Sequence, residues 1–197
     1  MSVTSEDLDA AAAAIRDGDL VVYPTETVYG LGADALDPEA IERAYATKGR
    51  DRSKPLSLGV PSADAAREYV VAGEREEAFM DAFLPGPVTV VCEKRDVVPN
   101  ALTGGRERVG VRVPDHEIAL ALLERVEPIT ATSANRSGTG SVRRVDALDP
   151  DFIDDVAIVL DGGETGGVES TVVDVANDTV IREGANADAI AEWLVEH

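Results

Sequence analysis

The sequence Tyr23-Pro24-Thr25-Glu26-Thr27-Val28-Tyr29-Gly30-Leu31-Gly32 follows a short apolar run, Leu20-Val21-Val22. The apolar run predicts a buried strand. Pro24 predicts the end of that strand, because proline has no backbone N–H with which to continue a central ladder. Two hydroxyls, a carboxylate and the Tyr29 ring then follow, and α/β folds often place such groups beyond the carboxyl end of a strand to form a site. On pattern alone, a Gly-rich turn without a functional role is equally compatible with this stretch.

Around this stretch, predicted strands first alternate with predicted helices and later predominate. Apolar spacing and capping residues predict helices after Thr4 or Ser5, Asp37, Ser62, Gly73, Asp115 and Asn186. Strands are predicted at 20–23, 56–60, 88–91, 109–113, from 129, at 157–160, and as a hairpin of 169–175 and 179–182. Residues 139–151 are predicted to form a loop or a short helix. The pattern favours an α/β fold in a single domain, 1–197, with helices packed on a twisted mixed sheet.

The charge of the chain is strongly negative. Its 197 residues include 38 acidic and 18 basic side chains, for a net charge of −20, and only three lysines. We interpret this dispersed, lysine-poor acidic surface as halophilic, because a salt-rich cytoplasm screens self-repulsion. No apolar stretch is long enough for a membrane span, and the N-terminus lacks the pattern of a signal peptide. A cytoplasmic location without membrane contact is therefore expected.

Cysteine and histidine are too scarce for most metal-site and catalytic-triad chemistry. Cys92 lies in an apolar run and is predicted to be a buried strand residue rather than a reactive thiol. His116 and His197 are the only histidines, so the sequence offers no His/Cys metal cluster. A Ser-His-Asp triad would depend on His116, and no Gly-x-Ser-x-Gly turn is present.

Basic residues are concentrated in three short stretches. Ten of the 18 belong to these stretches: Lys48, Arg50, Arg52, Lys54; Arg106, Arg108, Arg112; and Arg136, Arg143, Arg144. In so acidic a chain, such clusters favour a local anionic ligand, although loops often carry charge without one. Arginine predominates, and its planar fork suits bidentate recognition of phosphate.

Four predicted strand ends present polar side chains: Thr25, Arg112, Ser133 and Ser170. Arg112 lies among apolar neighbours, and a core-facing arginine needs an anionic partner. If these strand ends lie on one side of the sheet, we expect them to line a single concave site.

Six segments of the chain, taken in order, resemble the YrdC-like family. They are 23–32, Lys48-Gly49-Arg50, Val111-Arg112-Val113-Pro114, Thr132-Ser133-Ala134-Asn135-Arg136-Ser137-Gly138, Glu169-Ser170-Thr171-Val172 and Ile181-Arg182-Glu183-Gly184-Ala185. The resemblance extends from about residue 8 to the C-terminus. It implies an open, twisted mixed sheet with flanking helices around a large, concave, positively charged cavity. It also implies the short form of the family, without the extra C-terminal domain that some relatives carry.

The family resemblance implies a nucleotidyltransferase, L-threonylcarbamoyladenylate synthase. Such an enzyme makes threonylcarbamoyl-AMP and pyrophosphate from L-threonine, bicarbonate and ATP. A downstream tRNA threonylcarbamoyl transferase complex then uses the product to form N6-threonylcarbamoyladenosine in tRNA. Mg²⁺ is expected to enter with ATP, held by water and phosphate oxygens rather than by protein ligands.

The resemblance also assigns roles to individual residues. It implies catalytic roles for Lys48, Arg50, Ser133 and Asn135. It implies threonine binding by Thr25, Ser57, Arg112, Ser133 and Ser170. It implies ATP binding by Lys48, Arg50, Arg52, Arg108, Asn135, Arg143 and Arg182. In chemical terms, Lys48 would be a point charge for phosphate, Arg50 would bind phosphate in a fork, and Arg112 would pair with the threonine carboxylate.

One loop departs from the family pattern, and other functions remain open. Relatives usually have Pro-Thr where this chain has Val142-Arg143, so Arg143 is a candidate to replace the usual phosphate contact. The alternative from another functional class is a double-stranded RNA or tRNA-binding module without synthase activity. The net charge and the lack of stacking-aromatic motifs argue against it. A divergent paralogue with another substrate is a third hypothesis.

Overall fold

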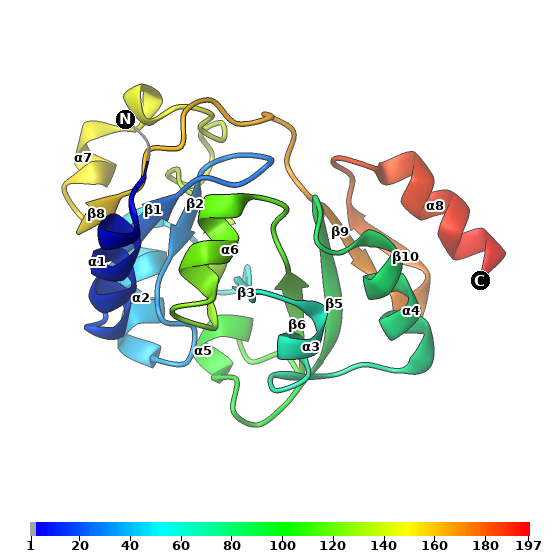
Figure 1. The fold of residues 1–197 in the computed structure, drawn as a ribbon. Helices are drawn as coiled ribbons and strands as arrows, with labels where there is room; N and C mark the ends of the chain where they lie inside the picture. The colour runs from blue at the N-terminus through cyan, green and yellow to red at the C-terminus, as the bar shows by residue number, and fades with distance from the viewer. Residues whose placement is uncertain (1–2) are drawn as a thin grey trace.

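The computed structural model describes residues 3–197, which form a mixed β-sheet with helices on both faces (Figure 1). The ten-stranded sheet has the order β10-β9-β5-β6-β3-β7-β2-β1-β8, and β4 pairs with β5 outside this path. The strands are β1 (Val21–Tyr23), β2 (Gly30–Gly32), β3 (Ser57–Gly59), β4 (Val70–Val71), β5 (Val88–Lys94), β6 (Arg108–Arg112), β7 (Ile129–Ser133), β8 (Ile158–Val159), β9 (Thr171–Asp174) and β10 (Thr179–Arg182). The predicted α/β class and mixed sheet are confirmed.

The helices are short and connect or flank the strands. They are α1 (Ser5–Arg16), α2 (Pro38–Lys48), α3 (Ala63–Ala66), α4 (Glu74–Phe83), α5 (Asn100–Thr103), α6 (Glu117–Leu123), α7 (Pro150–Ile153) and α8 (Ala187–Glu196), with 3₁₀ turns η1 (Val145–Ala147) and η2 (Val175–Asn177). Within residues 3–197, no helix combines the length and apolar character that a membrane span requires.

Residues 21–32 form a β-hairpin rather than a strand followed by a turn. β1 pairs antiparallel with β2, and Tyr23 lies opposite Gly30. A Cβ atom on Gly30 would come within 2.8 Å of the Tyr23 ring, so the ring occupies the space that a side chain would need. The glycines therefore allow the Tyr23 ring to pack flat across the hairpin. Residues 24–29, which include Thr25, Glu26 and Thr27, form the loop that joins the two strands.

Helix termini largely follow the predicted capping signals, with one correction. Thr4 and Asp7 form a reciprocal capping box at α1, and the Asp37 side chain accepts a hydrogen bond from Glu39 N at α2. The sequence predicts Asp115 as the cap of α6, but the N-cap is His116, and its side chain makes no capping hydrogen bond. An extended backbone at His116 moves the start of the helix by one residue.

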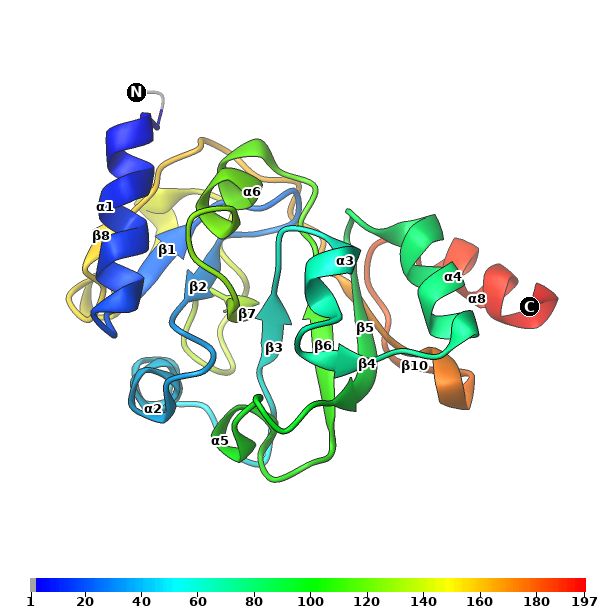
Figure 2. The ribbon, with the colours of Figure 1, turned by 60° about the horizontal axis from the view of Figure 1, so that its bottom comes forward.

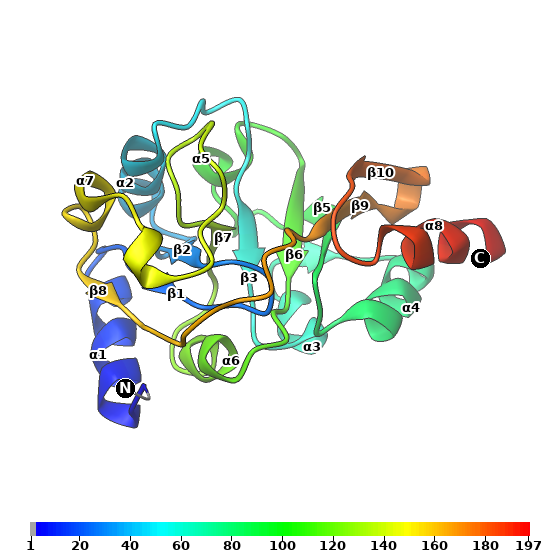
Figure 3. The ribbon, with the colours of Figure 1, turned by 90° about the horizontal axis from the view of Figure 1, so that it is seen from above.

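The core is divided by the sheet into two apolar clusters. One cluster joins α1 and α6 to the face of the sheet that carries Val21 and Ile129. The other includes α2, α4 and most of the remaining strands. Figure 3 shows α1 and α6 on one side of β1, β2 and β7, with α2 on the other side. Cys92 belongs to the larger cluster and is fully buried, as predicted, and burial raises the pKa of its thiol to about 12.

The four polar strand ends do not share one edge of the sheet. β3 pairs parallel with β6 but antiparallel with β7, so β6 and β7 run in opposite directions (Figure 2). Arg112 is the last residue of β6 and Ser133 is the last residue of β7, so the two residues lie toward opposite ends of the strands. They line one cavity because the register puts both side chains on the same face of the sheet: Gly59 lies opposite both Arg112 and Ile129, and Ser133 follows Ile129 by four residues on β7.

Candidate active site

A cavity of about 780 Å³ brings together most of the residues predicted for the site. This volume is within the usual range for sites that bind small molecules. Eight predicted residues line it: Thr25, Arg50, Ser57, Arg108, Arg112, Ser133, Ser170 and Arg182. The lining includes six basic side chains but only three acidic ones: Glu107, Glu169 and Asp174. This excess of basic side chains is opposite in sign to the net charge of the whole chain. The overall positive charge of the cavity stays a prediction.

Arg112 is buried at one end of the cavity and is held by the loop 24–29. Its Nη2 donates to Glu26 Oε1 at 2.9 Å and to Thr27 Oγ1 at 3.0 Å. The Arg112 side chain is 8% exposed and that of Glu26 is 18% exposed, so the pair is largely removed from water. Within residues 3–197, the Nε and Nη1 groups of Arg112 make no hydrogen bond, which leaves two donor groups for a ligand carboxylate or phosphate.

Hydroxyl groups around Arg112 are fixed by hydrogen bonds to one another and to the backbone. Thr25 Oγ1 donates to Val28 O at 2.7 Å and accepts from the N–H groups of Thr27 and Val28, which shapes the loop. Farther along the cavity wall, Ser170 Oγ lies 3.1 Å from Thr89 Oγ1. Thr25 and Ser170 are both buried, so these hydroxyls are positioned before any ligand arrives.

Lys48 holds the loop after β7 and does not line the cavity. Its Nζ donates to Ser133 O and to Asn135 O, while its own carbonyl accepts from Ser137 N. Lys48 is 2% exposed, and burial together with the nearby Arg50 guanidinium lowers its pKa to about 7. The side chain therefore positions the backbone of the loop 133–139. Its predicted contact with phosphate stays a prediction.

Arg50 projects from the loop that follows α2 and lines the cavity. Its Nε donates to Lys54 O at 3.0 Å and its Nη2 donates to Pro55 O at 3.2 Å. These bonds curl the loop 50–55 around the guanidinium. The left-handed conformation of Gly49 at the end of α2 turns the chain away from the helix just before Arg50.

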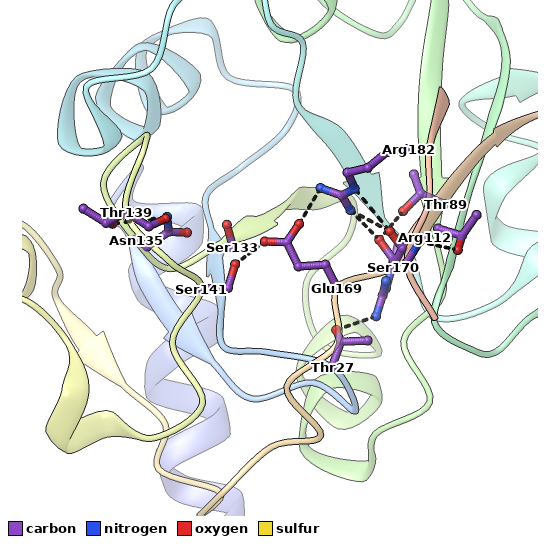
Figure 4. Close-up of polar contacts among 12 residues, drawn as sticks. Thr27, Thr89, Arg112, Ser133, Asn135, Thr139, Ser141, Glu169, Ser170 and Arg182 are labelled. Atoms are coloured by element: carbon purple, nitrogen blue, oxygen red, sulfur yellow. Dashed lines mark hydrogen bonds and ion pairs between the residues drawn. The ribbon is translucent and has the colours of Figure 1, made fainter. Parts of the chain in front are cut away.

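Glu169 connects two segments of the cavity wall that are far apart in sequence (Figure 4). Its Oε2 accepts from Arg182 Nη1 at 2.9 Å, and its Oε1 accepts from the Ser141 hydroxyl. Arg182 Nη2 also donates to Ser170 O at 2.8 Å and to Ser170 Oγ at 3.0 Å. Glu169 thus places a carboxylate between the loop after β7 and the arginine that ends β10.

Arg108 is tied to acidic residues, although it lines the cavity. Its Nη2 donates to Asp174 Oδ1 at 2.9 Å and to Val91 O at 2.7 Å, and lies 3.3 Å from Glu76 Oε1. The Glu76 and Asp174 side chains are 11% and 12% exposed. Arg108 therefore joins α4, β5 and β9, and its predicted contact with the nucleotide is not visible in these interactions.

The remaining predicted site residues lie outside the cavity lining. Arg52 pairs with Glu42 of α2, and Arg143 pairs with Glu164 at 2.8 Å. Asn135 Nδ2 donates to the carbonyls of its own loop, and its Oδ1 is buried without a hydrogen-bond partner among the described residues. Their predicted contacts with ATP stay predictions.

Three polar residues of the cavity lining, and Glu26, which pairs with Arg112, were not among those selected from the sequence. Glu26 and Thr27 lie within the stretch 23–32, and Glu169 lies within the segment 169–172, so the sequence marked these segments. It did not show which residues these side chains would contact. Thr89 follows a proline-rich turn, and nothing in its local sequence marks it. Only the pairing of β5 with β9 brings Thr89 next to Ser170.

Known proteins of the same family match this chain in sequence and in structure. The family model for Sua5, YciO and YrdC, described as "Telomere recombination", matches residues 13–184. The threonylcarbamoyl-AMP synthase of Pyrococcus abyssi is 49% identical over 84% of this chain and 49% of its own length. That of Bacillus subtilis is 38% identical over 90% of this chain and 53% of its own length. The chain thus spans about half the length of these two curated relatives.

A solved structure has the same fold as this chain. It is the crystal structure of Pyrococcus abyssi Sua5 complexed with L-threonine, which aligns with a TM-score of 0.86 and 43% identity. The alignment covers 93% of this chain and 56% of that one. Because the family model matches most of the chain and the fold agrees, the chain belongs to the Sua5/YciO/YrdC family.

Proposed function

We propose that this protein is an L-threonylcarbamoyladenylate synthase that acts on L-threonine, bicarbonate and ATP. The observation that carries the proposal is a single cavity that combines buried hydroxyl groups with several arginines. Arg112, Arg50 and Arg182 line it together with Thr25, Ser133 and Ser170. The names of the curated relatives support the same reaction.

The Arg112 end of the cavity is suited to an amino acid that carries a hydroxyl group. Its Nη1 group would donate to the threonine carboxylate, while Glu26 and Thr27 hold Nη2. Ser170 and Thr25 supply hydroxyls for the ammonium group and the side chain of threonine. L-threonine is the ligand in the Pyrococcus abyssi Sua5 complex, which supports this assignment.

The part of the cavity lined by Arg50 and Arg182 is suited to a nucleoside triphosphate. Arg50 and Arg182 would bind phosphate oxygens, and the backbone of the loop 133–139, held by Lys48, would position Ser133. ATP would arrive as its magnesium complex. We expect phosphate and water oxygens to hold the Mg²⁺, because magnesium usually keeps much of its coordination shell in such ligands.

The proposed chemistry needs no covalent intermediate with the protein. The threonine amine adds to bicarbonate carbon with loss of water, which gives a carbamate. A carbamate oxygen then attacks the α-phosphorus of ATP, and pyrophosphate leaves with the electron pair of the broken P–O bond. The protein contributes orientation of two anionic reactants in one cavity and neutralisation of their charges.

Pyrophosphate release tests the proposed function directly. The purified protein is incubated with ATP, Mg²⁺, bicarbonate and L-threonine at low and high salt, and each component is omitted in turn. The proposal predicts release that requires both threonine and bicarbonate, with an adenylate product detected by mass spectrometry. L-alanine serves as the control amino acid, because it retains the carboxylate but lacks the hydroxyl.

Other outcomes separate the remaining hypotheses. Folded protein without pyrophosphate release at either salt concentration would contradict the synthase proposal. Release with another amino acid would favour the divergent paralogue. Salt-sensitive binding of double-stranded RNA without ATP turnover would favour the RNA-binding module, which no contact in the cavity supports.

A further inference from the structure

Glu169 is an acidic residue at the centre of an otherwise basic part of the cavity. It precedes β9, and Figure 4 shows it extending between Ser141 on one side and Arg182 on the other. The Ser133 side chain lies beside it in the same view. No sequence-based role was assigned to this carboxylate, although it lines the same cavity as Arg50 and Ser133.

The contacts of Glu169 use both of its oxygens. Oε2 is 2.9 Å from Arg182 Nη1, and Oε1 accepts from the Ser141 hydroxyl. Its side chain is 39% exposed and that of Arg182 is 48% exposed, so the pair is open to solvent and to an incoming ligand. An ion pair of this exposure costs little to open.

The charge of Glu169 also acts, without direct contact, on two further basic residues that the family pattern places at the nucleotide. Its negative charge raises the pKa of Lys48 and of Arg50, against the larger lowering effect of burial. The positive charge of Arg182 lowers the pKa of Arg50, so the two guanidinium groups interact electrostatically. Among the described residues Glu169 forms an ion pair with Arg182, and its effect on Lys48 and Arg50 is smaller than that of burial.

We propose that Glu169 is an internal counter-anion that occupies part of the phosphate site and that a polyphosphate ligand displaces from Arg182. The phosphate chain would take over the Arg182 hydrogen bonds, and the Glu169 carboxylate would move away with the Ser141 hydroxyl released. Naming ATP as the ligand rests on the proposed function. The anion exchange itself rests only on the contacts of Glu169.

Glu169 affects both the stability of the empty cavity and the affinity of the cavity for phosphate. Without Glu169, the Arg50 and Arg182 guanidinium groups would repel each other in the empty cavity. With it, the empty site is stabilised, but phosphate binding is weakened, because displacing the carboxylate opposes binding. Glu169 thus sets the ATP affinity lower than the basic residues alone would give.

Isothermal titration calorimetry of Glu169→Gln tests the proposal. Glutamine keeps the shape and the hydrogen bond with Ser141 but removes the charge. We expect both tripolyphosphate and ATP to bind about tenfold more tightly than to the wild-type protein, because like charges in contact are costly. Threonine affinity should be unchanged. Glu169→Ala, which cannot contact Arg182 at all, should show the same gain.

Glu107→Gln is the matched control. Glu107 also lines the cavity, but no ion pair joins it to Arg182. Glu107→Gln makes the same change in net charge, so if the contact with Arg182 is what matters, it should alter the affinity for tripolyphosphate and ATP by less than about threefold. Equal or weaker polyphosphate binding by both Glu169 variants, or equal gains in Glu107→Gln, would overturn the proposal. A wild-type protein that binds neither anion would also overturn it. Tighter tripolyphosphate binding with no pyrophosphate release from ATP would instead overturn the proposed function alone.

Discussion

Arg112 and Glu26 form an ion pair of 2.9 Å whose side chains are 8% and 18% exposed, which fixes the guanidinium at one end of the cavity. The pair uses Nη2 alone, and Thr27 accepts from the same nitrogen. Arg112 is therefore rigid before a ligand binds, while Nε and Nη1 remain for the ligand. Glu26 Oε2, by contrast, is buried without a hydrogen-bond partner among residues 3–197.

Replacing Arg112 with alanine should raise the KM for threonine steeply. The KM should rise about 10- to 100-fold, because the variant lacks a charged hydrogen-bond donor to the threonine carboxylate. The variant should also lose about 3 kcal/mol of unfolding free energy, because Glu26 is left as an unpaired, largely buried charge. Steady-state pyrophosphate release and urea denaturation measure the two effects.

The control for Arg112→Ala is Arg125→Ala. Arg125 pairs with Asp9 between α6 and α1, away from the cavity lining, so its removal should leave the threonine KM unchanged. An unchanged threonine KM in Arg112→Ala would remove Arg112 from the threonine site, whatever its effect on stability.

Lys48 should make the stability of the protein depend on pH above neutrality. Its pKa is about 7 in the folded protein and 10.5 when unperturbed, so the unfolded chain binds more protons between these values. Unfolding free energy should therefore rise with pH across this window, by up to about 5 kcal/mol, and level off below pH 7. Denaturation of the wild type and Lys48→Met at pH 6, 7.5 and 9 isolates this contribution.

The quantity to compare across pH is the difference in unfolding free energy between the wild type and Lys48→Met. Tyr23, Tyr29 and Tyr69 also have pKa values raised to about 12, but they are present in both proteins and cancel. A difference that stays flat from pH 6 to 9 would mean that the two carbonyls of Ser133 and Asn135 keep the buried amine charged.

The sequence predicted the elements and many site residues, because those signals are local. Apolar spacing and N-cap residues located α1 and α2, and polar residues at strand ends indicated Arg112 and Ser133. Strand β2 was missed because Gly30-Leu31-Gly32 has weak strand propensity. Its pairing with both β1 and β7 makes it a strand.

What the sequence could not provide were partners that meet only after folding. Lys48 looked like a charged helix end, yet the loop after β7 covers it and accepts its hydrogen bonds. Glu169 and Ser141 are 28 residues apart, and Thr89 and Ser170 are 81 apart. Local pattern carries no information on contacts of this range, so a basic residue that is free for a ligand looks the same as one that is already paired.

Arg108 should prove to be mainly a stabilising residue. Arg108→Ala leaves Glu76 and Asp174 as nearly buried carboxylates without their cation, so unfolding free energy should fall by about 3 kcal/mol. Arg106→Ala is the matched variant, because Arg106 also lines the cavity but its Nη2 contacts only Ser53 O. A large rise in the KM for ATP in Arg108→Ala, with unchanged stability, would restore the predicted role in nucleotide binding.

Salt should stabilise the fold, since the net charge of −20 is dispersed over the surface. Raising KCl from 0.1 to 1 M shortens the screening length from about 10 to 3 Å, which removes most of the self-repulsion of the folded state. A gain of about 2 kcal/mol would raise Tm by roughly 4–8 °C in a chain of this size.

Differential scanning calorimetry in KCl, with sucrose as an uncharged control, measures this shift. Three exposed acidic residues that form no ion pair within residues 3–197, Glu124, Asp155 and Glu192, can be changed together to Gln, Asn and Gln. Because this triple variant carries less negative charge, it should be more stable than wild type at 0.1 M KCl and gain less from added salt. Equal responses of the two proteins to KCl would show that salt acts through apolar burial or ion binding and not through charge repulsion, which would remove the physical basis for calling the surface halophilic.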